Sequence, residues 1–424
     1  MLDTPVGISD MSLYIPSPRI DLEDILQQRA AEDPSFERRL RRAIESTNQM
    51  AIRFPAPWQD SVTLAAQAAR PLLTNETVAE GVRYLAVGTE TSVDMSKPIA
   101  AYAQGVLQRS GIQLPRTLSS FQVQHACAGG TIAMMSVAGM IKCTSRPGES
   151  GVVINTDIAR YQTPSTAEIT QGAGAVALRI ETNPKLLVLD THTVGLASSD
   201  EDDFFRPLGS VTARVKGRYS VDCYNDALNA AFLDHAARSQ VSPKDELAGH
   251  DYFVVHVPFH KMAVTGLSKL VERHLELDPR ETQEFLKNRH FDDGIDASRW
   301  IGNIYSGSAY MSLMFLLWNR FRAEGTAIVG KRVLIASYGS GNTMTVVSAT
   351  VAPEAPEVLA TWDLQAVLDA ASSADFDAYE TFVEKETYTL DSGPVTDGED
   401  VDEGLYYLKE IREDGYRIYD YRQE

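Results

Sequence analysis

Hydrophobic residues along the chain fall into short continuous runs separated by longer stretches of mixed polarity. Four of these runs are apolar and rich in β-branched residues, which is typical of strands buried on both faces. They are residues 84–89, 151–156, 252–257 and 332–337. Helix-like stretches lie between them, so the pattern predicts an α/β fold.

The chain also contains a weak internal repeat. In each copy, small residues open a helix-like stretch, a strand-like run follows and a glycine-rich segment comes next. The first copy comprises residues 127–136, 151–156 and 172–178, and the second comprises residues 302–311, 332–337 and 339–342. Two copies of one αβ unit predict two sheets around a shared helical layer.

Composition changes beyond about residue 355. Residues 391–424 carry eleven acidic and four basic side chains, yet five tyrosines lie between Tyr406 and Tyr421. Residues 404–411 read as a strand, followed by a turn at Asp414 and Gly415. A disordered acidic tail would be poor in aromatic residues. We therefore expect residues 356–424 to form an acidic, tyrosine-rich segment that packs on the body.

Composition limits the classes of function. The 424 residues are 44% hydrophobic and 23% charged, enough for a large core, and the net charge of −19 disfavours nucleic acid or an anionic membrane as partner. No run approaches the roughly 18 apolar residues of a spanning helix. The start of the chain lacks the pattern of a signal peptide, and three cysteines make no disulfide framework. A cytoplasmic location is expected.

Cys127 is the candidate nucleophile. It lies in Gln-His-Ala-Cys-Ala-Gly-Gly, where a strand-like stretch gives way to a helix-like one. The positive end of a helix dipole would make its thiolate accessible near neutral pH, and Gly129 and Gly130 would expose backbone N–H groups to an acyl oxygen. A buried packing cysteine is the alternative. Cys143 and Cys223 lack such neighbours and are interpreted as packing residues.

Other polar residues follow strand-like runs, where α/β enzymes place catalytic groups. Glu90 is either a carboxylate in a first helical turn or an acid/base whose pKa is raised by burial. His256 is either a catalytic group or a core histidine, with His125 and His260 as weaker candidates. Asn303 is either a site residue or a helix cap. Lys261 is either solvated or a phosphate ligand.

These motifs, in this order, resemble the hydroxymethylglutaryl-CoA synthase family of the thiolase superfamily. The matching segments are residues 87–94 (Val-Gly-Thr-Glu-Thr-Ser-Val-Asp), 126–131 (Ala-Cys-Ala-Gly-Gly-Thr), 157–161, 171–177, 256–262 (His-Val-Pro-Phe-His-Lys-Met), 302–308 (Gly-Asn-Ile-Tyr-Ser-Gly-Ser) and 337–341. The resemblance extends from about residue 14 to about residue 350, and more loosely through the tyrosine-rich end. Ala128 departs from members with an aromatic residue after the nucleophile, which affects the expected pocket shape.

The resemblance implies a thiolase-like fold of two duplicated αβ halves in a five-layered αβαβα arrangement. Residues 1–180 would form the half with the nucleophile, and residues 181–355 the half with the histidine and asparagine. It also implies a homodimer acting on acetyl-CoA and acetoacetyl-CoA in the mevalonate pathway, with no cofactor and no metal ion.

The resemblance further implies a role for each site residue. Cys127 would be acetylated, Glu90 would remove a methyl proton from the acetyl group, and His256 would act on the acceptor ketone. The remaining substrate-binding residues would be Asn303, Tyr305, Ser340, Thr170 and, facing the CoA phosphates, Lys261. A neutral imidazole and an amide suit polarisation of a ketone.

Three alternatives remain open. Relatives that build β-branches in polyketide pathways use acyl groups on an acyl carrier protein, which is usually acidic and would need a local basic patch on this chain. An initiating ketoacyl synthase also uses Cys, His and Asn on this fold, but its chemistry does not require Glu90. A non-catalytic homologue would be expected to lose Cys127 or Glu90, and this chain retains both.

Overall fold

The computed structural model describes residues 4–210, 212–384 and 392–423. The first three residues, which entered the expectation about a signal peptide, lie outside the described residues. Residues 385–391 and 424 of the expected acidic segment also lie outside them.

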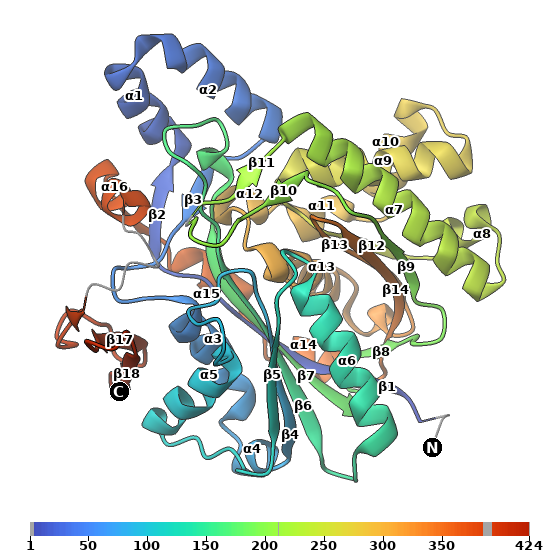
Figure 1. The fold of residues 1–424 in the computed structure, drawn as a ribbon. Helices are drawn as coiled ribbons and strands as arrows, with labels where there is room; N and C mark the ends of the chain where they lie inside the picture. Colours follow the sequence, from blue (N-terminus) through green and yellow to red (C-terminus); the bar gives the residue numbers. More distant parts are fainter. Residues whose placement is uncertain (1–3, 211, 385–391, 424) are drawn as a thin grey trace.

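A mixed ten-stranded sheet forms the centre of the molecule (Figure 1). Its strand order is β12-β13-β14-β8-β1-β7-β6-β4-β5, and β9 also pairs with β14. The strands are β1 (Val6–Tyr14), β4 (Val82–Gly88), β5 (Ser119–Val123), β6 (Ser150–Ile158), β7 (Ala173–Thr182), β8 (Leu187–Leu189), β9 (Gly195–Ser198), β12 (Tyr252–Val255), β13 (Arg332–Gly339) and β14 (Thr343–Val351). The four strand-like runs of the sequence are β4, β6, β12 and β13, so the α/β prediction is confirmed.

The short strand β8 links the sheets of the two halves. Its residues pair antiparallel with β1 on one side and with β14 on the other. The repeat predicted two sheets, whereas backbone hydrogen bonding continues from one half into the other. The physical reason is that both edges of an extended segment offer unpaired N–H and C=O groups.

Helices cover both faces of each half and fill the space between the halves. The main ones are α3 (Ser61–Ala69), α5 (Ile99–Leu107), α6 (Gly129–Thr144), α7 (Gly217–Ser239), α9 (His260–Leu275) and α13 (Ser308–Glu324). Side chains of α6 and α13 share one core cluster, α3 and α5 contribute to a second, and α7 and α9 to a third.

Alternating strand residues point into these different cores. On β6, Val153 packs in the central cluster with α6 and α13, whereas Val152 and Ile154 face the outer cluster with α3 and α5. On β12, Val254 faces the centre and Phe253 faces α7 and α9. This period of two places a helical layer on each side of each half. The arrangement is the five-layered, thiolase-like αβαβα fold.

The internal repeat is also present in the topology. In the first half, β4 runs parallel to β6 and β7 returns antiparallel, with α6 between β4 and β6 in the chain. In the second half, β12 runs parallel to β13 and β14 returns antiparallel, with α13 between β12 and β13 in the chain. Each half therefore places the ends of two parallel strands at the same edge of the sheet.

The segment Ala126–Thr144, which includes α6, is long and apolar enough to cross a membrane by length and composition, with a mean hydropathy of 1.4. This differs from the expectation that no such stretch exists. The helix lies in the central layer, where its residues pack against β4, β6 and β7 of the first half and share a core cluster with α13. Its apolar character is accounted for by that core position.

The C-terminal segment folds against the first half. Strands β17 and β18 form an antiparallel hairpin, in which the rings of Tyr406 and Tyr421 lie 4.8 Å apart. Asp60, at the start of α3, accepts hydrogen bonds from Arg417 at 2.7 Å and from the hydroxyl of Tyr419 at 2.8 Å. Elements after residue 354 are α14 (Ala355–Leu359), α15 (Leu364–Asp369), β15 (Ser372–Ser373), α16 (Phe376–Glu384), β16 (Gly393–Pro394), β17 (Tyr406–Ile411) and β18 (Arg417–Tyr421).

Shorter elements complete the two halves. They are β2 (Pro18–Asp21), α1 (Leu22–Glu32), α2 (Pro34–Thr47), β3 (Ala51–Arg53), α4 (Glu76–Glu80), β10 (Phe204–Phe205), β11 (Arg214–Val215), α8 (Pro243–Ala248), α10 (Pro279–Asn288), α11 (Phe291–Ile295) and α12 (Ser298–Ile301). Single 3₁₀ turns include η3 (Glu168–Thr170) and η4 (Tyr305–Gly307).

Candidate active site

A cavity of about 390 Å³ brings together most of the residues that the sequence singled out. It lies where β12 and β13 end and α6 begins. Six of the predicted site residues line it: Cys127, Thr170, His256, Asn303, Tyr305 and Ser340. Glu90 and Lys261 are not part of its lining.

Cys127 lies two residues before α6, at the turn that enters the central layer. A Cβ atom on Gly88 would lie 2.2 Å from the backbone nitrogen of Gly130, so only glycine lets the end of β4 approach the start of the helix so closely. The preceding Ala126 has a φ of 38°, a conformation that costs energy for a residue with a side chain. The turn therefore holds Cys127 in one defined orientation.

The electrostatic surroundings of Cys127 differ from the sequence-based expectation. Burial raises the pKa of the Cys127 thiol well above its usual value, and the nearby carboxyl groups of Glu90, Asp157 and Asp203 act in the same direction. The helix N-terminus was expected to make the thiolate accessible near neutral pH. Burial and three acidic neighbours oppose that effect, so the resting group is the protonated thiol.

Glu90 follows β4 and is buried. Burial raises the pKa of its carboxyl group to about 8; Arg206 acts in the opposite direction, and Asp157 adds to the rise. Among the described residues, Oε1 of Glu90 has no hydrogen-bond partner. A carboxyl group with this pKa exchanges its proton near neutral pH, which is the property required of a general acid/base.

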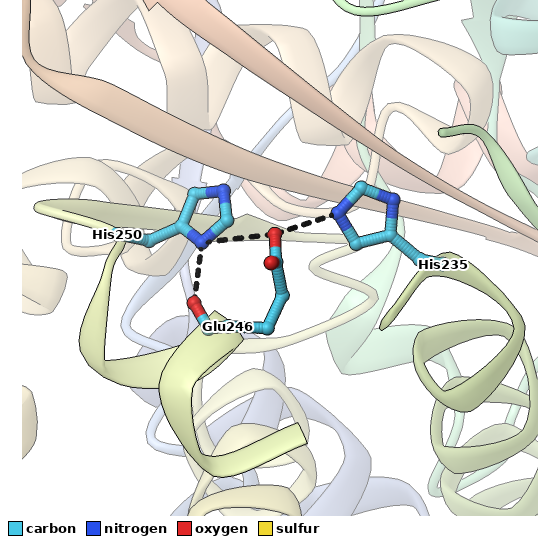
Figure 2. Close-up of side chains that lie close together, drawn as sticks. All are labelled: His235, Glu246 and His250. Carbon is cyan, nitrogen blue, oxygen red and sulfur yellow. Dashed lines mark hydrogen bonds and ion pairs between the residues drawn. The ribbon is translucent and has the colours of Figure 1, made fainter. Parts of the chain in front are cut away.

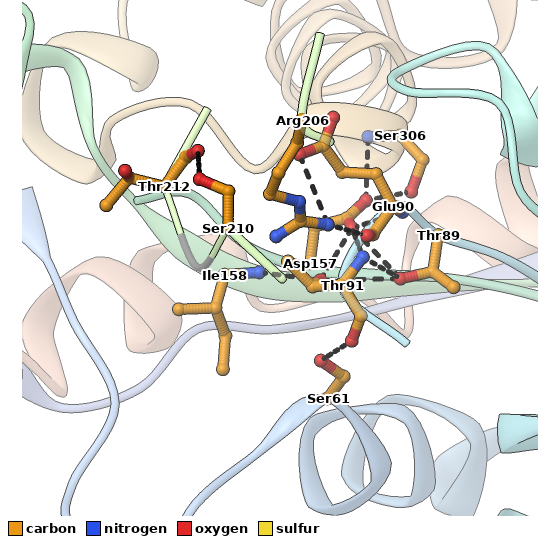
Figure 3. Close-up of polar contacts among 10 residues, drawn as sticks. All are labelled: Ser61, Thr89, Glu90, Thr91, Asp157, Ile158, Arg206, Ser210, Thr212 and Ser306. Carbon is orange, nitrogen blue, oxygen red and sulfur yellow. Dashed lines mark hydrogen bonds and ion pairs between the residues drawn. The ribbon is translucent and has the colours of Figure 1, made fainter. Parts of the chain in front are cut away.

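Asp157, at the end of β6, organises the segment that contains Glu90 (Figure 3). Its Oδ1 atom accepts hydrogen bonds from the backbone nitrogen of Glu90 at 2.9 Å and from the hydroxyls of Thr89 at 3.0 Å and Thr91 at 2.7 Å. Its Oδ2 atom accepts from the backbone nitrogen of Ser306 at 3.0 Å. One buried carboxylate therefore joins segments from both halves.

His256 directly follows β12 and extends its pairing with β13, because its backbone nitrogen donates to the carbonyl of Ala336 at 2.8 Å. Burial lowers the pKa of the imidazole to about 3. The ring is therefore neutral throughout the physiological pH range, as polarisation of a ketone by hydrogen bonding requires.

Asn303 is held by its own neighbours. Its Oδ1 atom accepts hydrogen bonds from the backbone nitrogen of Tyr305 at 2.8 Å and from the hydroxyl of Ser308 at 2.9 Å. The preceding Gly302 has a φ of 92°, and a Cβ atom there would lie 1.9 Å from the carbonyl oxygen of Gln171. Because the amide oxygen is engaged, the NH₂ group of Asn303 is the part that can meet a substrate oxygen.

Aromatic rings form one wall of the cavity. Tyr305 packs edge to face with Phe204 and Tyr161, with ring centroids 5.9 Å and 6.5 Å away. These rings and Cys127 belong to one small hydrophobic cluster. The sequence indicated no role for Tyr161, although this residue ends the matching segment 157–161, and gave no signal for Phe204. Their segments meet only in the folded chain.

Thr170 is positioned by the C-terminal segment. Its backbone carbonyl accepts from the nitrogen of Asn303 at 3.1 Å. The hydroxyl of Tyr379, on α16, donates to Glu168 at 3.1 Å and accepts from Gln171 at 2.9 Å, which ties η3 to α16. The acidic segment thus supports one wall of the cavity, a role that the active-site motifs did not indicate.

Lys261 lies outside the cavity, in the first turn of α9. Its ammonium group donates to the backbone carbonyl of Glu45, on α2, at 2.6 Å. Thr47, two residues further along α2, does line the cavity. Lys261 is therefore exposed near the cavity opening, and its contact with a phosphate stays a prediction.

The other cysteines differ from each other. Cys223 is buried on α7, as a packing residue should be, whereas Cys143 is exposed. The packing interpretation of Cys143 is wrong, because this residue lies in the last turn of α6, where the helix leaves the core.

His235, Glu246 and His250 form a buried group that could hold a metal ion by residue type (Figure 2). Their atoms are already engaged within the protein. Nε2 of His235 lies 3.1 Å from Oε1 of Glu246, and Nδ1 of His250 lies 2.7 Å from the backbone oxygen of Glu246. Arg332 donates to the same Oε1 at 3.2 Å. A cation already occupies the position beside the carboxylate, so the group is best described as a hydrogen-bonded network.

Comparison with protein families gives two matches. Residues 3–185 match the family described as hydroxymethylglutaryl-coenzyme A synthase N terminal, and residues 281–422 match its C-terminal counterpart. The hydroxymethylglutaryl-CoA synthase of Enterococcus faecalis is 32% identical over 336 residues, covering 79% of this chain and 80% of the relative. That of Haloferax volcanii is 28% identical, covering 89% and 91%.

Solved structures agree with these matches. MvaS in complex with 3-hydroxy-3-methylglutaryl coenzyme A is 31% identical and covers 100% of both chains, with a TM-score of 0.84. An HMG-CoA synthase complexed with CoA is 29% identical, covers 98% of this chain and 100% of its own, and has a TM-score of 0.83. The chain belongs to the hydroxymethylglutaryl-CoA synthase family.

Proposed function

We propose that this protein is a hydroxymethylglutaryl-CoA synthase, an acyltransferase that condenses acetyl-CoA with acetoacetyl-CoA and water to give 3-hydroxy-3-methylglutaryl-CoA and CoA. The observation that carries the proposal is the shared cavity of Cys127, His256 and Asn303, with the acid/base candidate Glu90 buried beside it. Relatives named for this activity, at 28% and 32% identity, support it.

In the first step, the sulfur of Cys127 attacks the thioester carbonyl of acetyl-CoA. The Cys–acyl bond forms as the bond to the CoA sulfur breaks, and the thiol proton passes to the departing CoA. The transfer involves no net gain or loss of protons. Because burial raises the pKa of the Cys127 thiol, the sulfur loses its proton as it attacks and does not rest as a thiolate.

In the second step, the carboxylate of Glu90 removes a methyl proton from acetyl-Cys127. The enolate carbon then attacks the C3 ketone of acetoacetyl-CoA, while His256 and Asn303 donate hydrogen bonds to the ketone oxygen. Glu90 returns the proton to the alkoxide. Water then hydrolyses the thioester bond that joins the product to Cys127, which releases 3-hydroxy-3-methylglutaryl-CoA and restores the thiol. A single group with a pKa of about 8 can act both as base and as acid.

The direct test is a product assay with acetyl-CoA and acetoacetyl-CoA, analysed by mass spectrometry. Wild-type protein should form 3-hydroxy-3-methylglutaryl-CoA, and Cys127→Ser should form none. Acetyl-CoA hydrolysis without carbon–carbon bond formation would contradict the proposal.

A carrier-protein-bound acceptor is the second candidate, because the basic groups that an acidic carrier requires lie beside the cavity. Despite the net charge of −19, exposed basic residues lie on elements that border the cavity. Arg218 lines the cavity itself, and α2, whose Thr47 also lines it, carries four exposed arginines: Arg38, Arg39, Arg41 and Arg42. These groups could bind the phosphates of CoA or an acidic carrier.

The two acceptors can be separated in parallel assays. Free acetoacetyl-CoA and an acetoacetyl-loaded carrier protein are supplied at equal concentration, and kcat/KM is compared. We propose free CoA substrates as the preferred ones, as expected for the mevalonate pathway. A large preference for the loaded carrier would place the chain with the β-branching enzymes.

We also propose that the protein acts as a homodimer in the cytoplasm. The family resemblance supports the dimer, and the cysteine content supports a reducing compartment. Light scattering of the purified chain tests the first proposal, and localisation of a tagged chain in its cell of origin tests the second.

A further inference from the structure

Arg206 follows β10 and lies against the segment that carries Glu90 (Figure 3). Its Nη2 atom donates a hydrogen bond to the backbone carbonyl of Glu90 and lies 3.7 Å from Glu90 Oε1. The Arg206 side chain is 13% exposed and that of Glu90 is 7% exposed. Because water screens this pair poorly, the attraction between the two groups is stronger than at the surface.

The other titratable groups around Glu90 come from four other positions in the chain. They are Asp157 at the end of β6, Cys127 before α6, and the hydroxyls of Tyr161 and Tyr305. Each of these groups is neutral when protonated and negative after it loses its proton. Arg206 is the cation among these described neighbours, so it is the group that can offset a negative charge on Glu90.

The segment that carries Arg206 is itself held in place. Asp203, three residues earlier, accepts hydrogen bonds from the hydroxyl of Tyr338 at 2.8 Å and from the backbone nitrogen of Gly341 at 2.9 Å. Phe204 lines the cavity. The guanidinium group therefore reaches Glu90 from a segment that is fixed to the opposite half of the molecule.

We propose that Arg206 is a positioning residue that orients the carboxyl group of Glu90 and stabilises its charged form, the form that removes a proton from the acetyl group. The inference rests on the proposed function and adds a residue to it. Arg206 itself need not touch a substrate. It acts by keeping enough Glu90 ionised at neutral pH for enolate formation.

The sign of the effect can be worked out. Burial raises the pKa of Glu90 to about 8, and Arg206 opposes that rise. A neutral residue at position 206 should raise this pKa further, by the roughly 1–3 units that a close opposite charge contributes. Since condensation needs the ionised carboxylate, the acidic limb of its pH profile should move to higher pH.

The test compares wild-type protein with two neutral variants, Arg206→Met and Arg206→Gln. Circular dichroism shows whether each variant is folded, and one folded variant is enough for the test. The acidic limb of kcat/KM for condensation should lie near pH 8 in the wild type and higher by about 1–3 pH units in the neutral variants. Arg206→Lys, which keeps the charge, should stay closer to wild type. Arg214→Met, at an exposed arginine on β11, is the matched control.

A second readout does not depend on catalysis. Infrared difference spectra of each protein against its Glu90→Gln derivative report the protonated carboxyl band of Glu90, which is titrated with pH. The pH midpoint of this band should be higher in the neutral variants than in the wild type. Unchanged infrared and kinetic midpoints, with only a lower rate, would overturn the proposal and assign Arg206 a merely structural role.

The two readouts also separate this inference from the proposed function. If wild-type protein forms neither acetyl-enzyme nor product while the infrared midpoint still shifts in Arg206→Met, the proposed function fails and the pairing of Arg206 with Glu90 stands.

Discussion

The backbone nitrogen of Glu90 donates a hydrogen bond to Oδ1 of Asp157 at 2.9 Å, which ties the acid/base candidate to the end of β6. The other oxygen of Asp157 accepts from Ser306, in the half that carries His256 and Asn303. A single buried carboxylate therefore sets the position of one half of the candidate site relative to the other.

Asp157→Asn is expected to lower both stability and activity. The amide has nearly the same shape, but its NH₂ group faces N–H and O–H donors and leaves at least one of them unpaired. The free energy of unfolding should fall by about 1–3 kcal/mol, measured by urea denaturation, and condensation should fall with it. Asp292→Asn, at an exposed position on α11, is the control. Unchanged stability would show that the network around Asp157 tolerates the loss.

Cys127→Ser should abolish acetyl-enzyme formation without unfolding the protein, because a hydroxyl is a much weaker nucleophile and the side chains are nearly isosteric. Intact-mass measurement after addition of acetyl-CoA detects the acetyl group. Cys143→Ser, at the exposed cysteine of α6, should still be acetylated. An acetyl group that maps to Cys143 or Cys223 in the wild type would sink the assignment.

Glu90→Ala should still form acetyl-Cys127, because the first step exchanges one thiol for another. Condensation should fall by roughly 10²–10⁴-fold, as is typical when a positioned acid/base is lost. Acetyl-enzyme should then accumulate in the presence of acetoacetyl-CoA, and exchange of the acetyl methyl protons with deuterium should stop. Near-normal condensation in this variant would reduce Glu90 to a buried structural carboxyl.

His256→Ala should weaken use of acetoacetyl-CoA more than acetyl transfer, because the neutral imidazole is assigned to the acceptor ketone. With a pKa lowered to about 3, His256 should also add no limb to the pH profile between pH 5 and pH 9. Single-turnover kinetics separate the two half-reactions. If acetylation falls as far as the complete reaction does, the imidazole is serving Cys127 instead.

His250 should make the protein less stable at acidic pH. Burial lowers its pKa from 6.5 to about 4, so the folded state holds the ring neutral while the unfolded state takes up a proton below pH 6.5. The stabilisation is complete above pH 6.5 and is lost progressively as the pH falls towards 4. Between pH 7.5 and pH 5.0 this amounts to about 2 kcal/mol.

Urea denaturation at the two pH values measures that loss. His250→Gln, which keeps a donor and an acceptor, should lose about 2 kcal/mol less than the wild type between pH 7.5 and pH 5.0. His192→Gln, at an exposed histidine, should behave as the wild type does. Equal pH dependence in all three proteins would contradict the assignment to His250.

Several parts of the fold and the site could be predicted from local sequence. The runs that became β4, β6, β12 and β13 are apolar enough to be strands wherever they are buried. Glu90 and His256 follow β4 and β12, and Cys127 lies two residues before the helix that follows β5. Since parallel neighbours in a sheet end at the same edge, the positions of Glu90 after β4 and Cys127 after β5 already indicated that these two residues lie close together. Strand β12 runs opposite to β4 through the sheet, so the approach of His256 depends on the tertiary structure.

Tertiary structure decided what depends on neighbours distant in sequence. The charge state of Cys127 follows from its burial near Glu90, Asp157 and Asp203, which outweighs the local helix dipole. Arg206 reaches Glu90 because the fold places β10, whose Phe204 lines the cavity, beside the segment after β4. Electrostatic energies depend on distance and on exclusion of water, and neither quantity is encoded by any single stretch of the chain.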